Sequence, residues 1–230
     1  MNEEKHKMII QYSRNGAARY ISHLDMQRAF GRAVRRAKLP ACYSKGFNPH
    51  IIMSFASPLS VGYATEGDYL ELPLAVVMDP QEIKDALNAV MPPDLRIIGV
   101  HEMGEPSKKL MAQNYSASYS IYFHFENEAD CDTMKDAVKV LYKAKNYLAT
   151  DRRGKEIDIR PLVFSVDAQN GRQVNCKLKN ASDGALNPAV LATALLKEAG
   201  VQADYDICRE DCFALENGKE VPFSRAFRAE

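Results

Sequence analysis

The feature that most constrains the fold is an order of strand-forming and helix-forming segments that occurs twice along the 230 residues. The first half predicts the order β-α-β-β-α-β, which is the ferredoxin-like, split βαβ arrangement. The expected strands are 7–13, 51–57, 67–74 and 95–100. Ser22 caps the first expected helix and Asp79-Pro80 opens the second, while Leu39-Pro40 and Pro92-Pro93 end them.

The second half predicts the same order again, without clear sequence identity to the first. The expected strands are 115–125, 156–166, 172–178 and 204–213. One helix is expected over 128–144, and a second begins at Pro188 and ends at Gly200. The sequence therefore predicts an α+β protein with two tandem ferredoxin-like domains.

The expected domain boundaries follow from a polar segment that contains glycine and proline. We expect an N-terminal domain over 1–103, a linker over 104–114 and a C-terminal domain over 115–230. With 46% hydrophobic residues the chain can build a core in each domain. No apolar run approaches the roughly 20 residues that span a bilayer, and no signal-peptide core is present. We therefore expect a cytoplasmic protein without membrane partners.

The five cysteines are scattered, and their odd number favours reduced thiols. Cys208 and Cys212 are four residues apart and no second pair accompanies them, so they do not form a zinc-binding pattern. The sequence predicts no metal site and no cofactor.

Charge is distributed unevenly, although the whole chain is formally neutral. The first fifty residues contain ten basic and three acidic side chains, so the rest of the chain is acidic. Such a separation creates a local field that favours an anionic partner.

The basic charge is concentrated on the first expected helix. Its apolar residues share one face: Met26, Phe30, Ala33, Val34 and Ala37. Four arginines fall on the opposite side: Arg28, Arg32, Arg35 and Arg36. Like charges at this spacing repel, and phosphate suits the bidentate geometry of guanidinium. A solvated face, or ion pairs with the acidic remainder, is the alternative.

The run YSKGFNPH after this helix combines rings, a cation and polar side chains. Tyr43, Phe47 and His50 offer stacking surfaces, and Ser44, Lys45 and Asn48 offer polar contacts. This combination is typical of sites for single-stranded nucleic acid. The alternative is an ordered connector whose aromatic rings close the core, and for Phe47 alone that alternative is favoured.

Two histidines in the basic region are candidates for acid–base catalysis of RNA cleavage. His23 and His50 have the side chain whose pKa lies nearest neutrality. The alternative is that His23 bonds to the backbone at the start of the helix. No hydrolase triad, zinc-protease motif or phosphate-binding loop accompanies them.

Further cations occur in the second half, at Arg152, Arg153 and Arg160. Arg160 is expected either to reach the same ligand or to pair with Asp158 or another acid, and pairing is favoured.

Several segments of the chain carry a resemblance to a known family. They are residues 19–72, from RYISHLDMQRAF to GDYLEL, and the later pieces DRRGKEIDIRPLV, SDGALNPAVLATALL and ICRED. They resemble a bacterial family of unknown function, the radical-SAM-associated domain. Members of that family stand alone or are fused to a radical-SAM protein, and they often lie beside genes for ribosomal proteins and a ribonuclease. The resemblance implies work on RNA or ribosomes, and the missing cluster motif makes the chain similar to the stand-alone form.

A weaker similarity connects the chain with the repeat-processing endoribonucleases of CRISPR systems, in domain architecture and in a histidine near the first helix. The chain lacks their glycine-rich loop, because Glu198-Ala199-Gly200 is too short. We expect an RNA-binding accessory protein that presents RNA or a ribosomal component to a separate radical-SAM enzyme. A metal-independent endoribonuclease and a protein-only adaptor are the alternatives.

Overall fold

The computed structural model describes residues 5–104 and 109–226. Within these ranges the fold is mixed α+β, with four α-helices and mostly antiparallel strand pairing. The chain divides into two compact units, one formed by residues 1–114 and 211–230 and the other by residues 115–210. We call them the N-terminal unit and the central unit.

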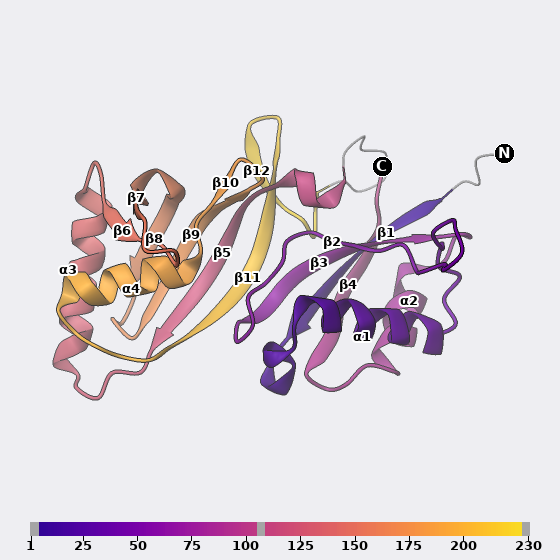
Figure 1. Ribbon diagram of the computed structural model, residues 1–230, viewed down its shortest axis with the longest axis horizontal. Helices are drawn as coiled ribbons and strands as arrows, with labels where there is room; N and C mark the ends of the chain where they lie inside the picture. The colour runs from indigo at the N-terminus through magenta and orange to yellow at the C-terminus, as the bar shows by residue number, and fades with distance from the viewer. Residues whose placement is uncertain (1–4, 105–108, 227–230) are drawn as a thin grey trace. The chain divides into compact units, whose positions relative to one another are not determined.

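The N-terminal unit contains a sheet with helices on one side (Figure 1). Its elements are β1 (His6–Arg14), η1 (Gly16–Tyr20), α1 (His23–Arg36), β2 (Ser54–Phe55), β3 (Ala64–Leu74), α2 (Pro80–Asn88), β4 (Leu95–Glu102), η2 (Leu110–Gln113) and β12 (Lys219–Pro222). β1 lies between β3 and β4 and pairs antiparallel with both, while β2 pairs with β3.

Helix α1 begins and ends where local chemistry requires it. The Ser22 hydroxyl accepts a hydrogen bond from the Asp25 backbone N–H at 3.2 Å, as an N-cap does. At the other end, Lys38 adopts a left-handed conformation with φ of 53°. The N–H groups of Lys38 and Leu39 then bond to the carbonyls of Arg35 and Val34, which is a Schellman ending.

One apolar cluster joins both helices of the N-terminal unit to its strands. Met26, Phe30 and Val34 of α1 are at most 2% exposed, and they pack into the same cluster as Ile83 and Leu87 of α2. The expected apolar face of α1 is thus confirmed, with Ala37 only partly buried. This packing leaves the other side of α1 to solvent.

The strand expected over 51–57 is much shorter than its composition indicates. Only Ser54–Phe55 pairs with β3, and Ile51 instead forms an isolated bridge with Tyr43. Residues 43–51 fold back on themselves as a closed loop, so Ile51 does not join the ladder of β2 with β3. The closed loop, residues 43–51, forms one boundary of the candidate site.

The central unit repeats the arrangement of helices beside an antiparallel sheet. Its elements are β5 (Asn114–Phe123), α3 (Ala129–Lys143), β6 (Leu148–Thr150), β7 (Glu156–Asp158), η3 (Arg160–Leu162), β8 (Val163–Ala168), β9 (Gln173–Ala181), β10 (Gly184–Ala185), α4 (Pro188–Ala199) and the first half of β11 (Tyr205–Glu216), which continues into the N-terminal unit from Asp211. β9 pairs with β5, β8 and β10. Gly200 ends α4 in the left-handed conformation, as expected.

The strand expected over 156–166 is divided into β7, η3 and β8. Pro161 lies in the interruption, and a proline has no N–H to donate to a strand ladder. Residues 156–158 pair with β6 in a separate two-stranded sheet, whereas 163–168 pair with β9.

The structure also groups the C-terminal residues differently from the expected domain 115–230. From Asp211 onward the chain belongs to the N-terminal unit. The reason is packing: the Tyr69 hydroxyl donates a 2.6 Å hydrogen bond to Asp211, and the Phe223 ring lies 5.4 Å from the Tyr69 ring. Of the expected linker, residues 105–108 lie outside the described residues, and 110–113 form η2.

Candidate nucleic-acid interface

The exposed side of α1 forms one wall of a groove in the N-terminal unit. Arg28, Arg32 and Arg35 line it from the helix, at spacings of four and three residues that place them along one side. His50, Ile51 and Met53 line it from the loop and the segment that follow the helix. The hollow measures about 570 Å³ and is open to solvent.

The arginines of this groove differ in their acidic partners. The Arg28 guanidinium lies 2.9 Å from the Asp25 carboxylate, in an exposed ion pair. A hydrogen bond from Ser22, and then Arg28 itself, holds the pKa of Asp25 below its usual range. Within residues 5–104 and 109–226, no carboxylate lies within 4 Å of the guanidinium of Arg32 or Arg35, which leaves both available to an anion.

Arg36 does not share this groove. It lines a second hollow of about 410 Å³ on the other flank of α1, together with Val90, Met91 and Pro92. Arg32 borders both hollows. The row of four arginines expected from the sequence therefore divides into three that face the groove and one that faces away.

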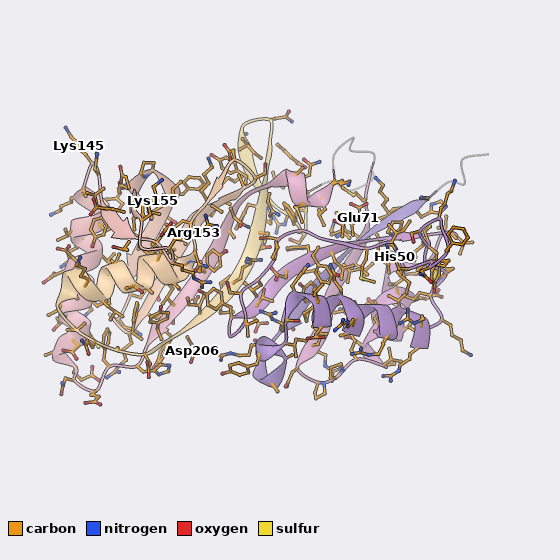
Figure 2. The ribbon with its side chains drawn as sticks, in the orientation of Figure 1. His50, Glu71, Lys145, Arg153, Lys155 and Asp206 are labelled. Atoms are coloured by element: carbon orange, nitrogen blue, oxygen red, sulfur yellow. The ribbon has the colours of Figure 1, made fainter. Side chains whose placement is uncertain are left out.

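The loop 43–51 is closed by Ser44 and His50 (Figure 2 labels His50). The Ser44 hydroxyl lies 2.8 Å from His50 Nδ1 and accepts a hydrogen bond from the His50 backbone N–H at 3.1 Å. The Ser44 N–H in turn donates to the His50 carbonyl at 2.8 Å. These bonds hold the imidazole of His50 at the mouth of the groove.

The other expected contact residues of this loop lie outside the groove. Phe47 is fully exposed, so the interpretation that it closes the core is wrong. Tyr43 is about half exposed at 48%, and Lys45 and Asn48 are exposed as well. They form a separate tip, at which an aromatic ring stands in solvent without packing.

The structure does not bring the two candidate catalytic histidines into the groove together. His23 is the first residue of α1, and its ring packs edge-on against Phe55 with centroids 5.1 Å apart. Its Nε2 lies 3.2 Å from the Gln27 side-chain amide. Only His50 lines the groove.

Of the arginines singled out in the central unit, Arg160 stabilises local structure, and Arg152 and Arg153 lie on a turn of their own. The Arg160 guanidinium donates to the carbonyls of Val163 at 2.9 Å and Tyr142 at 3.5 Å. Asp158 accepts a hydrogen bond from the Arg160 backbone, so the expected side-chain pairing is replaced by carbonyl contacts.

Arg152 and Arg153 are exposed on the turn before β7, where Figure 2 labels Arg153 and Lys155. The Asp151 carboxylate accepts hydrogen bonds from the backbone N–H groups of Lys155 and Arg153, which hold the pKa of Asp151 below its usual range. This acceptor role orders the turn.

The groove is also lined by residues that the sequence did not single out: Leu24, Gln27, Gly31, Ile51 and Met53. Gly31 carries a detectable signal, because a glycine inside a helix costs about 1 kcal/mol relative to alanine. Ile51 and Met53 gave no such signal, since their apolar character is equally typical of a buried strand.

The described residues contain no helix that is both long enough and apolar enough to cross a membrane. The model of a bacterial family matches residues 7–188, which include the groove, the loop 43–51 and all of β9. The chain belongs to that family. It is described as an uncharacterized protein conserved in bacteria (DUF2344). Among curated proteins, none matches the sequence.

Proposed function

We propose that this DUF2344 protein binds RNA through the groove beside α1, as an accessory to a radical-SAM enzyme. The observation that carries the proposal is the alignment of three guanidiniums along one groove wall, two of them without a carboxylate within 4 Å in the described part of the chain. Guanidinium binds phosphate oxygens through two parallel hydrogen bonds. Phosphate contacts dominate the affinity of proteins for nucleic acids.

The surroundings of the groove support a single-stranded ligand. His50 at the mouth offers a ring, and the fully exposed Phe47 lies three residues before it in the same loop. Exposed rings beside cations are typical of surfaces on which unpaired bases stack. RNA is favoured over other polyanions by the family resemblance, which also supplies the radical-SAM partner.

Cleavage has less support than binding. Acid–base cleavage of RNA by two histidines needs both at the scissile phosphate, and the groove contains only His50. We therefore propose that the protein binds RNA without cleaving it. Shortening of the RNA in the same binding samples would reveal endoribonuclease activity.

The proposal extends to the fold, in which each unit is a ferredoxin-like domain. Support comes from strand order, which is β2-β3-β1-β4 in the N-terminal unit. In the central unit β8 pairs with β9, β9 with β5, and β11 lies beside β5. Both orders correspond to the split βαβ arrangement, although β2 has only two residues.

The test is binding to total cellular RNA across a salt series. The variant carries Arg28→Glu, Arg32→Glu and Arg35→Glu. Its matched control carries three equal charge reversals at exposed lysines of the central unit, at Lys139, Lys143 and Lys145. If each groove arginine neutralises one phosphate, the slope of log affinity against log salt concentration for the wild type should be about −2 or steeper, since each single-stranded phosphate contributes roughly −0.7.

We expect the groove variant to lose binding while the control retains most of it, with both folded by circular dichroism. Equal loss in the two variants would show that net charge alone attracts the RNA. Weak binding by the wild type at every salt concentration would reject RNA as the ligand.

A further inference from the structure

We propose that the outer edge of β6, in the central unit, binds an extended peptide segment of another protein. The segment has apolar side chains at its centre and acidic side chains at its two ends. This surface lies outside the groove beside α1, so the proposal does not depend on RNA binding. Three features carry it: the direction of the β6 backbone groups, a hollow beside the strand, and the charges at both ends of the strand.

The backbone of β6 presents hydrogen-bonding groups on two sides. Where its antiparallel ladder with β7 begins, the Ile159 N–H donates a hydrogen bond to the Tyr147 carbonyl at 2.9 Å. Because hydrogen-bonded positions alternate along an antiparallel ladder, Tyr147 and Ala149 direct their backbone groups toward β7. The N–H and C=O groups of Leu148 and Thr150 therefore point the opposite way.

This outer edge is open to a partner. Among the residues that the structure describes, β7 is the only strand that pairs with β6. Leu148 is 59% exposed and Thr150 is exposed as well. Strand edges are commonly blunted by charged residues or proline, and Leu148–Thr150 contains neither. An extended peptide fits the two outward donors and two outward acceptors, because its own backbone groups alternate at the same spacing.

A hollow of about 490 Å³ beside β6 would receive side chains of such a peptide. Five consecutive residues line it, at 146–150. Side chains of a strand alternate between its two faces, so an unbroken run of lining residues indicates that the backbone of β6 itself borders the hollow. Val140 of α3 and Val190 and Ala194 of α4 add apolar side chains. Every second side chain of an added strand would therefore meet an apolar surface.

The charges at the ends of β6 favour acidic residues in the partner and oppose a second copy of this chain. Lys145 precedes β6, and Arg153 and Lys155 lie on the turn after it; all three are exposed (Figure 2). If two copies paired through all four outward groups, Leu148 of one would lie opposite Thr150 of the other. That register would bring Lys145 toward Arg153 of the second copy, and like charges in opposed positions destabilise a strand pair.

The hollow itself has little net charge. Glu198 accepts a hydrogen bond from the Tyr147 hydroxyl at 3.3 Å. Burial, and then the Glu198 carboxylate, raise the pKa of Tyr147, so its hydroxyl remains a donor to Glu198. Lys197 and Glu156 also line the hollow, and their charges are opposite. This distribution fits a peptide with a neutral centre and acidic ends.

The test is a titration of the ¹⁵N-labelled full chain with a nine-residue peptide, in which five alternating valines and threonines lie between two pairs of glutamates. We expect saturable binding and slower hydrogen exchange at the amides of Leu148 and Thr150. The Ala149 amide, which faces β7, should change little. A peptide N-methylated at its five central residues should bind at least about tenfold more weakly, because it has lost the donors that reach β6. A peptide with lysines in place of the glutamates should also bind more weakly.

Thr150→Pro removes one outward N–H and should weaken peptide binding about 3- to 10-fold, the equivalent of one backbone hydrogen bond. The matched control is Glu156→Pro, directly across the ladder, which removes an N–H from the other edge of the hairpin and should not weaken binding. Slow exchange at the Ala149 amide shows that the ladder persists in each variant. If Thr150→Pro loses the ladder, the N-methylated peptide decides.

Four results would overturn the proposal. The glutamate-flanked peptide shows no saturable binding, or the N-methylated peptide binds equally well without protecting Leu148 and Thr150, which would indicate docking of side chains alone. The lysine-flanked peptide binds as tightly, which would refute the acidic partner. Protection of the same two amides rises with protein concentration in the absence of peptide, which would assign the edge to a second copy of the chain.

Discussion

Arg35 and Arg36 are adjacent in sequence, equally charged and both exposed, yet they face different hollows. Successive helical residues point about 100° apart, which accounts for the division. Separate substitutions to alanine remove the same charge from neighbouring positions of one helix. The pair therefore distinguishes a geometrically defined phosphate site from general electrostatic attraction.

For Arg35→Ala we expect a 10- to 100-fold loss of affinity for single-stranded RNA. The magnitude is that of one charge-assisted hydrogen bond to a buried or partly buried anion, about 1.5–3 kcal/mol. The salt slope should become shallower by roughly 0.7, which corresponds to one phosphate. For Arg36→Ala we expect an unchanged slope and a change in affinity smaller than about threefold, since only the long-range field is altered.

Fluorescence anisotropy with a labelled single-stranded RNA at four or more salt concentrations measures both quantities. Comparable losses and comparable slopes in the two variants would refute the reasoning, because the groove would then contribute nothing beyond its charge. A larger loss for Arg36→Ala would move the site to the hollow beside Met91.

Three other predictions concern stability and thiol chemistry. Gly31→Ala should raise the free energy of unfolding by about 1 kcal/mol. A lower free energy of unfolding than that of the wild type, measured by urea titration, would show that the added methyl is not accommodated. Phe223→Ala should cost about 3–5 kcal/mol, because the ring is fully buried against Tyr69; a cost below about 1 kcal/mol would contradict that packing. Burial raises the pKa of the Cys176 thiol to about 12, so this group gains its thiolate only far above neutrality. Alkylation at pH 8 followed by mass spectrometry should label the partly exposed Cys42 well before Cys176.

Local signals in the sequence predicted the helices well. α1 is specified by the cap at Ser22 and the apolar spacing from Met26 to Val34, and all of this information lies within the helix itself. α4 is specified in the same way, by Pro188 at its first turn and Gly200 after its last. Such elements are predictable because their determinants are a few residues apart.

The short strand β2 and the C-terminal boundary were not predictable on the same basis. Apolar composition at 51–57 does not show whether Ile51 pairs with β3 or with Tyr43, because both pairings bury the same side chain. The placement of residues 211–226 depends on contacts such as Phe223 with Tyr69, far apart in sequence. No local pattern records those contacts.

The candidate site likewise combines features set by local sequence with features set by contacts between residues far apart in the chain. The exposure of four arginines on the polar side of α1, away from its apolar face, follows from helical spacing, although one of the four lies on a different flank from the others. Which of them share a groove depends on where His50 and Met53 fall, and this placement results from the closure of the loop by Ser44.

The chain passes from the N-terminal unit to the central unit at Asn114–Tyr115 and back at Glu210–Asp211. The central unit is thus contiguous in sequence, whereas the N-terminal unit is interrupted by it. During synthesis on the ribosome, Tyr69 emerges before Phe223, and the whole central unit is made between them. The packing around Tyr69 can therefore be completed only after the central unit has been made, whereas the apolar cluster beneath α1 is built from residues between Met8 and Ile97 and can form before it.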